Sequence, residues 1–172
     1  MIPRKARVFW PLLSLLVLTD CTTKMLAEAR LGPGNVPYEV LGDVVQLTLA
    51  YNRGAATGIE VGEWSRLVFT GLAIGILAIL GTMYRKATAS DRWLALGLAL
   101  VAGGAVGNLL DRLRSERGVV DFIDIGVGSY RFWIFNVADM GVVVGAALLG
   151  FLLWHRDRAA DRLTGSSEPA SS

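Results

Sequence analysis

The feature that most constrains this chain is a set of long apolar runs that carry almost no charge. Leu67 to Tyr84 and Trp93 to Leu110 each hold 18 uncharged residues. As helices rising about 1.5 Å per residue they reach roughly 27 Å, close to the hydrocarbon core of about 30 Å. Phe132 to Trp154 carries one charge, Asp139, and Val8 to Ala27 is apolar over most of its length. The sequence therefore predicts an all-α membrane protein with four transmembrane helices, at about 8–27, 67–84, 93–112 and 132–154.

Composition agrees and excludes several classes of protein. The 172 residues are 53% hydrophobic and 19% charged, and the net charge of +2 leaves no basic surface of the kind that binds nucleic acid. The single cysteine, Cys21, has no partner for an internal disulfide, and the single histidine, His155, builds no recognised zinc site with it. We expect no metal and no cofactor. The remaining candidates for chemistry are Asp, Asn, Arg and Lys residues in or beside the apolar runs.

The order of the spans predicts a topology. Four spans place both termini and the turn from Arg85 to Arg92 on one side, and that side carries nine Lys/Arg residues. The other side carries eight in about twice the length of chain, so the positive-inside rule predicts cytoplasmic termini. The N-terminus also resembles a secretory signal, but Asp20 before Cys21 is the wrong chemistry for cleavage, so we interpret it as a retained first helix. Residues 1–155 then form one membrane domain, followed by a disordered tail at 156–172.

Two connections on the opposite, outer side are candidates for extended structure. Large apolar residues occupy every second position from Val45 to Tyr51 and alternate with Gln46, Thr48 and Ala50, within a connection at about 36–62. This period of two predicts strands and a small sheet resting on the membrane. A second β-like run, Val119 to Val127, lies in the connection at about 113–131. The predicted fold is thus a four-helix membrane protein with a small β-sheet cradle and a short loop or helix segment on its outer side.

Charged and amide side chains within the spans are the candidate functional groups, because such groups are costly at membrane depth. Three sets share a helix face by their spacing: Asp20 with Lys24; Asn108 with Asp111 and Arg112; and Asn136 with Asp139. A salt bridge or an interhelical hydrogen bond would be the purely structural interpretation of each set.

The outer run near residue 120 adds two more carboxylates. In a strand, Asp121 and Asp124 point to opposite faces, so only one of them can line a given site. Two carboxylates in a partly buried site share a proton, so that one acts as a base toward water while the other donates a hydrogen bond. Asp139 with Asp121 would supply such a pair, oriented by Asn108 and Asn136. Periodicity alone leaves the choice between Asp121 and Asp124 open.

At this point the chain resembles lipoprotein signal peptidase (signal peptidase II), a family of four-helix bacterial membrane proteases. The matching blocks, in order, are Asp20 with Thr23 and Lys24; Asn52 to Ala56; Gly103 to Arg112; Val119 to Ile123; and Phe135 to Asp139. Any one of these blocks alone would be weak evidence. Five blocks in order over residues 20 to 139 make the resemblance specific.

The resemblance implies an aspartyl endopeptidase of the bacterial inner membrane, with its active site near the outer face. Its substrates would be prolipoproteins whose cysteine carries an S-diacylglyceryl group, cut on the N-terminal side of that cysteine. Membrane lipid would be a further partner, and cyclic peptides of the globomycin type would be inhibitors. By the family pattern Asp121 and Asp139 are catalytic and Asn108 and Asn136 orient them. The residues implied in the substrate cleft or its structural support are Asp20, Lys24, Asn52, Arg53, Gly54, Gly104, Asp111, Arg112 and Ala138.

One departure from the family pattern bears on function. After Asn52 to Ala56 the family commonly has an aromatic residue followed by Ser, where this chain has Thr57 and Gly58. No presumed catalytic group is lost, so we expect activity. The alternatives are an inactive homologue that acts as a lipoprotein-binding scaffold, and a small proton-coupled transporter, since buried Asp and Lys also build ion pathways.

Overall fold

The computed structural model describes residues 2–32, 36–54 and 62–165, apart from the side chains of 157 and 159–165. Thr57 and Gly58 lie outside the described residues. In chain order the elements are α1 (Arg4–Arg30), β1 (Tyr38–Leu41), β2 (Val45–Asn52), the 3₁₀ turn η1 (Gly62–Trp64), α2 (Ser65–Lys86), α3 (Arg92–Arg114), β3 (Val119–Val127), β4 (Tyr130–Arg131) and α4 (Val137–Gly165).

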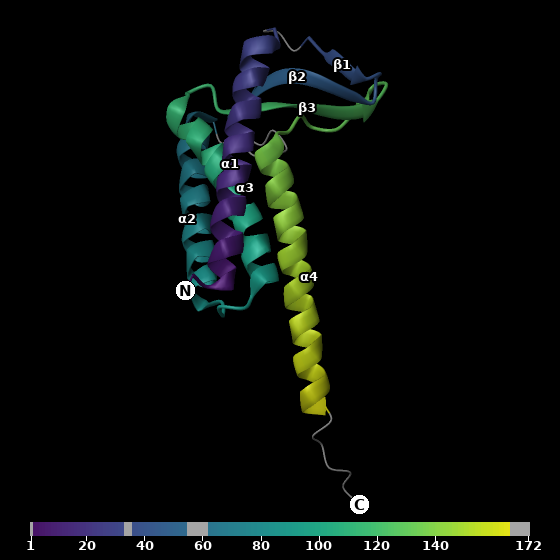
Figure 1. The fold of residues 1–172 in the computed structure, drawn as a ribbon. Helices are drawn as coiled ribbons and strands as arrows, with labels where there is room; N and C mark the ends of the chain where they lie inside the picture. The colour runs from purple at the N-terminus through teal and green to yellow at the C-terminus, as the bar shows by residue number, and fades with distance from the viewer. Residues whose placement is uncertain (1, 33–35, 55–61, 166–172) are drawn as a thin grey trace, which may run out of the picture.

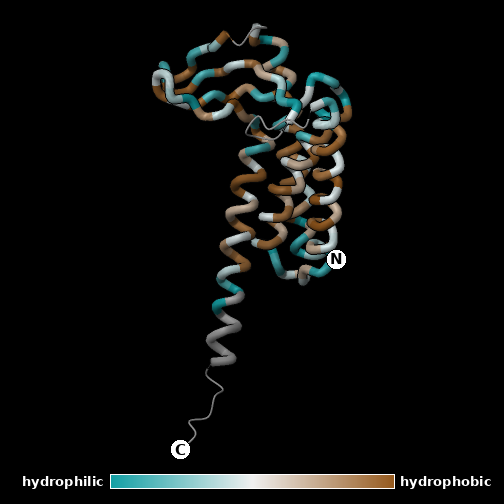
Figure 2. The backbone as a smooth tube through the Cα atoms, turned by 180° about the vertical axis from the view of Figure 1, so that it is seen from behind, coloured by the Kyte–Doolittle hydropathy of each residue, from teal (hydrophilic) through white to brown (hydrophobic). Residues whose placement is uncertain are grey.

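Four helices form an elongated bundle with the sheet across one end, as Figure 1 shows. All four are long and apolar enough to cross a membrane, which makes this a multi-pass membrane protein. In Figure 2 the bundle is mostly brown, while the sheet alternates between teal and brown. The start of α1 and the end of α4 lie away from the sheet. The predicted fold class is therefore confirmed.

Helix α3 is the centre of the bundle, and it packs on α1, α2 and α4. Within the described residues α2 and α4 do not contact each other, so they flank α3 on separate sides. The hydrophobic core lies in the half of the bundle away from the sheet, where Phe9, Leu80, Leu98 and Leu149 meet. The other half of the bundle, next to the sheet, buries charged and amide side chains instead.

The sheet is antiparallel with the order β1-β2-β3-β4. It joins the two outer connections, because β2 pairs with β3 from Val45 opposite Ile125 to Asn52 opposite Val119. The register shifts between Leu47 and Ala50. The connection predicted as an outer loop at 113–131 thus supplies a central strand.

Two helix boundaries at the C-terminal end differ from the prediction. Helix α4 begins at Val137 rather than at 132, because Phe135 forms backbone hydrogen bonds with Ile123 of β3 before the helix starts. It also continues to Gly165, beyond the end predicted for the last helix at 154. That stretch is rich in Arg and Ala and has no Gly or Pro before Gly165, which favours a helix.

Candidate active site

Asp121 lies on β3, in the sheet at one end of the bundle, and only 2% of the residue is exposed. Its Oδ1 accepts a 2.6 Å hydrogen bond from Asn136 Nδ2, and its Oδ2 accepts a 3.1 Å bond from Asn52 Nδ2. The carboxylate is therefore held from both sides by amide donors.

Asp139 lies in the first turn of α4 and takes part in a reciprocal cap of that helix. The Asn136 side-chain oxygen accepts from the Asp139 backbone N–H at 3.0 Å, and Asp139 Oδ2 accepts from the Asn136 backbone N–H at 3.2 Å. This is the capping-box pattern with Asn at the N-cap and Asp three residues later. Because Asp139 Oδ1 accepts a 2.8 Å bond from Asn108 Nδ2, its carboxylate is also fixed to α3.

The two amides connect the two carboxylates. Asn136 is fully buried, and its Nδ2 lies 2.6 Å from Asp121 Oδ1 and 3.1 Å from Asn108 Oδ1. Asn136 donates to the Asp121 carboxylate and exchanges the two capping hydrogen bonds with Asp139. Asn108 donates to the Asp139 carboxylate, so one continuous network holds both carboxylates. The predicted set of two aspartates and two asparagines is thus brought together from α3, β3 and α4.

Burial and, after it, the charge of Asp139 raise the pKa of Asp121 from 3.8 to about 7, against the lowering effect of the Asn52 and Asn136 amides and of the Lys24 charge. A carboxyl that titrates near neutrality exchanges a proton readily at physiological pH.

Asp124 belongs to a different network on the same strand. Its Oδ2 accepts from Thr48 Oγ1 at 3.3 Å, and its Oδ1 accepts from Arg131 Nε at 2.9 Å. Arg131 also forms an ion pair with Asp43. Asp121 and Asp124 therefore do not share a site, as expected from their spacing in a strand.

A buried ionic cluster lies between α1 and α3, next to the pair of carboxylates Asp121 and Asp139, which is called the dyad below. Lys24 is 2% exposed, and its ammonium lies 2.8 Å from both Asp20 Oδ2 and Asp111 Oδ2 and 2.9 Å from Asn108 Oδ1. Asp20 Oδ1 accepts from the Ala138 backbone N–H at 2.9 Å, at the start of α4. Lys24 and Asp111 also line a small cavity of about 230 Å³ with Glu28 and Arg117, whose lining does not include Asp121 or Asp139.

Close helix contacts set the spacing of this cluster. An ideal Cβ added at Gly104 would lie 2.3 Å from the Ala138 carbonyl oxygen, and one at Gly107 would lie 2.5 Å from Asp20 Oδ2. Glycine at these positions lets the α3 backbone approach α1 and α4 closely.

A tight turn after β2 holds Asn52, one of the two amide donors to Asp121, in place. The Gly54 N–H donates to Asn52 Oδ1 at 3.0 Å, which closes a tight turn, and the Gly54 carbonyl accepts from Arg112 at 3.0 Å. Gly118 adopts φ +103°, and a Cβ there would collide with the Asn52 carbonyl. Asn52 is therefore held between its own turn and the start of β3.

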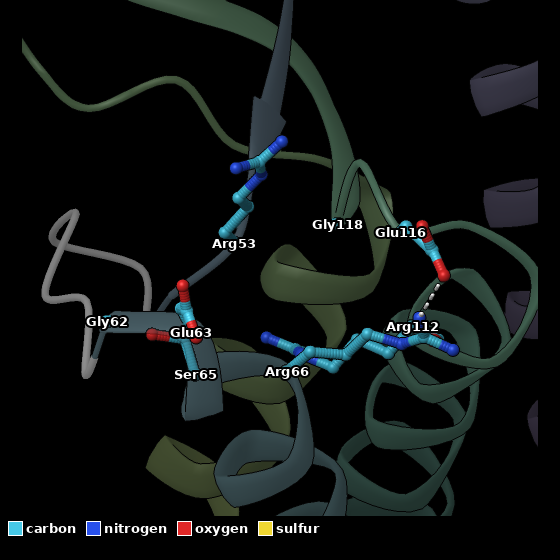
Figure 3. Close-up of a pocket in the computed structure, with 8 residues that line it drawn as sticks. All are labelled: Arg53, Gly62, Glu63, Ser65, Arg66, Arg112, Glu116 and Gly118. Carbon is cyan, nitrogen blue, oxygen red and sulfur yellow. Dashed lines mark hydrogen bonds and ion pairs between the residues drawn. The ribbon is translucent and has the colours of Figure 1, made fainter.

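Figure 3 shows a polar cavity of about 560 Å³ beside this turn, with Arg53, Arg66 and Arg112 from three different parts of the chain. Arg66 Nε donates to the Arg112 carbonyl at 2.8 Å, and its NH1 forms a 3.7 Å ion pair with Glu116. Glu63 and Glu116 also line the cavity, so its guanidinium groups offer donors for carbonyl oxygens beside two carboxylates.

An apolar groove of about 300 Å³ opens at Asp139 on the other side of the dyad. It is lined by Phe132, Trp133, Phe135, Asp139, Met140, Val143 and Val144. One carboxylate of the dyad therefore lies at the border between a buried polar network and an apolar surface. No cluster of His, Cys, Asp and Glu that fits a metal ion occurs among residues 2–32, 36–54 and 62–165.

Comparison with known proteins agrees with this architecture. The profile of the family described as signal peptidase (SPase) II matches residues 12–155. The chain belongs to the signal peptidase II family. The resemblance carried by the five sequence blocks is thereby confirmed, and these blocks supply the dyad, its amides and the ionic cluster of this signal peptidase II family member.

Several relatives are named lipoprotein signal peptidase. The one from Rhodococcus jostii is 43% identical over 78% of this chain and 66% of its own length, and the one from Burkholderia mallei is 38% identical over 88% and 90%. The chain thus spans just under two thirds of the first relative and nearly all of the second. The solved structure of a bacterial membrane enzyme matches with a TM-score of 0.75 and 27% sequence identity, over 94% of this chain and 92% of that chain. A second solved bacterial membrane enzyme matches with a TM-score of 0.72 and 31% identity, over 83% of this chain and 89% of that chain.

Some contributors to the site were not predicted from the sequence. Phe135 aligns the segment before α4 against β3, Gly107 makes room for Asp20, and Gly118 makes room for Asn52. The Gly107 position was visible as part of a glycine-rich helix face, whereas the roles of Phe135 and Gly118 depend on a strand pairing between distant segments.

Proposed function

We propose that this protein is an aspartyl endopeptidase that removes the signal peptide from bacterial prolipoproteins whose cysteine carries an S-diacylglyceryl group. The observation that carries the proposal is the pair of carboxylates, Asp121 and Asp139, held by one amide network, with Asp121 titrating near neutrality. Family membership supports the substrate class.

In the proposed mechanism one carboxylate removes a proton from water, and the resulting hydroxide attacks the peptide carbonyl just before the modified cysteine. The protonated partner donates to the carbonyl oxygen, which gives a tetrahedral diol. Collapse of this diol breaks the C–N bond and passes a proton to the leaving amine. The products are a signal peptide with a free carboxylate and a lipoprotein with a free cysteine amine.

We assign the remaining residues by their place around the dyad. Asn108 and Asn136 orient the two carboxylates. Asn52, Arg53, Gly54 and Arg112 form the wall of the substrate cleft on the outer side. The supporting residues behind the dyad are Asp20, Lys24, Gly104, Asp111 and Ala138. The apolar groove at Asp139 suits the hydrophobic segment of the signal peptide, since that segment ends close to the scissile bond.

The proposed function also includes a cellular location and an orientation in the membrane. We place the protein in the inner membrane with both termini in the cytoplasm, because the end of the bundle away from the sheet carries the larger density of Lys and Arg. The dyad then lies near the outer face, where the sheet meets membrane lipid. Cyclic peptides of the globomycin type are expected to compete with substrate for the dyad.

The test is cleavage of a purified diacylglyceryl-modified prolipoprotein by the purified protein in detergent, beside the unmodified precursor and the Asp139→Asn variant. Asp124→Asn is the matched control, because it removes a carboxylate from β3, the strand that also carries Asp121, and its partners among the described residues are Thr48 and Arg131. We expect cleavage of the modified precursor alone, lost in Asp139→Asn and kept in Asp124→Asn. Absence of cleavage by the folded wild-type protein would favour a lipoprotein-binding scaffold.

A further inference from the structure

Lys24 is a buried lysine whose role is not explained by charge compensation alone. Its ammonium contacts three acceptors, two of which are carboxylate oxygens of Asp20 and Asp111 at 2.8 Å. These two already provide more negative charge than the lysine needs. The third contact, at 2.9 Å, is with a neutral amide oxygen, Asn108 Oδ1, and it points toward the dyad.

The Asn108 contact fixes the direction of an amide. The oxygen and nitrogen ends of an Asn side chain have nearly the same shape, so their hydrogen-bond partners decide which way the group points. Lys24 can only donate, and an ionised Asp139 can only accept. With Lys24 on one side, the amide oxygen must face α1 and the NH2 group must face Asp139, where it makes the 2.8 Å bond.

Asn136 does not replace Lys24 in this role. Its NH2 group has two hydrogens but three acceptors within reach: Asp121 Oδ1 at 2.6 Å, Asn108 Oδ1 at 3.1 Å and the Val120 carbonyl at 3.3 Å. The shortest bond goes to Asp121, which leaves one hydrogen for the other two acceptors. Lys24 is the only cation among the partners of the Asn108 oxygen within the described residues.

We propose that Lys24 is a positioning residue of the dyad, which acts through Asn108 by holding the NH2 group of that amide against Asp139. The proposal rests on the peptidase function assigned above. It predicts that loss of the lysine ammonium lets the Asn108 amide rotate, so that its oxygen can face Asp139. A carboxylate that loses its donor in this way is less stable when ionised, and the dyad then takes up a proton at higher pH.

The charged groups around Lys24 come from four elements and from the turn before β3. Asp20 and Glu28 lie on α1, Asp111, Arg112 and Arg114 lie on α3, Arg117 lies in the turn, Asp121 lies on β3 and Asp139 lies on α4. Arg112 directs its guanidinium to the backbone carbonyls of Asn108 and Gly54, so it does not bond to the Asn108 side chain. Loss of Lys24 therefore removes the one cation that bonds directly to the Asn108 side chain within the described residues.

The first experiment compares Lys24→Met with Lys5→Met in the full-length protein. Lys5 is the matched control because it lies on the same helix, at the far end of the bundle, and donates to the carbonyls of Tyr84 and Ala87. We expect Lys24→Met to lower kcat by about tenfold to a hundredfold, as for a lost hydrogen bond to a charged group, with KM changed less than about twofold. The acid limb of its pH profile should move to higher pH, while Lys5→Met keeps the wild-type profile.

The second experiment tests whether Lys24 acts through Asn108. In an Asn108→Ala background, measured by single turnover with excess enzyme, Lys24→Met should cause no further shift of the acid limb, because residues of one network do not add. The charge of Lys24 also lowers the pKa of Asp121 directly, and that effect falls on the alkaline limb. If Lys24→Met fails to fold, the charge-neutral pair Asp20→Asn with Lys24→Met replaces it, since this pair removes the cation together with one of its carboxylate partners and leaves no donor at position 24 for Asn108 Oδ1.

Two results would overturn the proposal while the wild-type protein still cleaves its substrate. One is a folded Lys24→Met or charge-neutral double variant with the wild-type kcat and pH profile. The other is a loss that matches the fall in folded protein, or that adds fully to the loss in Asn108→Ala. No cleavage by the wild-type protein would instead contradict the peptidase function itself.

Discussion

The closest approach of α3 to α4 makes a sharp prediction for Gly104→Ala. In the structure an added Cβ would lie 2.3 Å from the Ala138 carbonyl oxygen and 2.7 Å from Val142 Cγ2. Since ordinary contacts of this kind begin near 3.4 Å, the first turn of α4 would have to move by about 1 Å. Ala138 is the residue before Asp139, so this displacement falls on the proposed catalytic pair.

The magnitude follows from that displacement. Overpacking of this kind costs about 1–3 kcal/mol of stability. A movement of about 1 Å lengthens the 2.8 Å bond between Asn108 Nδ2 and Asp139 Oδ1 beyond hydrogen-bond distance, and misplacement of about 1 Å commonly lowers the rate by about 100-fold. We therefore expect a larger effect on kcat than on the melting temperature.

The assay pairs thermal unfolding in detergent with the rate of prolipoprotein cleavage. Gly75→Ala is the matched control, because Gly75 lies within a helix and an added Cβ there meets nothing within 4 Å. That variant should cleave at the wild-type rate and melt at the same or a slightly higher temperature. Equal rates and melting temperatures for Gly104→Ala and the wild type would refute the idea that this helix contact sets the dyad.

Three further outcomes follow from the site. The rate of cleavage should fall as pH rises through about 7, because Asp121 loses its proton there. Between about pH 4 and 7 the contribution of Asp121 to the free energy of unfolding should decrease as pH rises, because its carboxyl deprotonates at lower pH in the unfolded state. The pH dependence of the cleavage rate and of the melting temperature checks these two expectations. Asn136→Ala should cost about 1 kcal/mol as a lost helix cap but lower kcat by about 100-fold, measured by unfolding and cleavage. Tyr51→Phe removes an exposed hydroxyl bonded to Glu28 and Arg117, so stability should fall by less than about 1 kcal/mol with cleavage unchanged.

The parts of this structure that the sequence predicted are those with a local signal. Four apolar spans, the strand at Val45 and the pairs Asn136 with Asp139 and Asp20 with Lys24 follow from periodicity and from the cost of charge in a membrane. The pairing of β2 with β3 does not, because hydrogen bonds between distant segments have no periodic signature. Periodicity therefore separated Asp121 from Asp124 by face, but only the tertiary structure distinguishes their partners.

The error at the start of α4 has a physical cause that also bears on the proposed chemistry. The segment from Phe132 to Asn136 is apolar enough to form the first turn of α4. However, the backbone of Phe135 pairs with Ile123 of β3, which prevents the segment from joining the helix. The helix can then begin only after Asn136, whose side chain caps it and at the same time donates to Asp121. A helix that began at 132 would occupy the Asn136 backbone N–H in its own ladder and leave none for Asp139. The late start of α4 is therefore what allows one asparagine to hold both carboxylates.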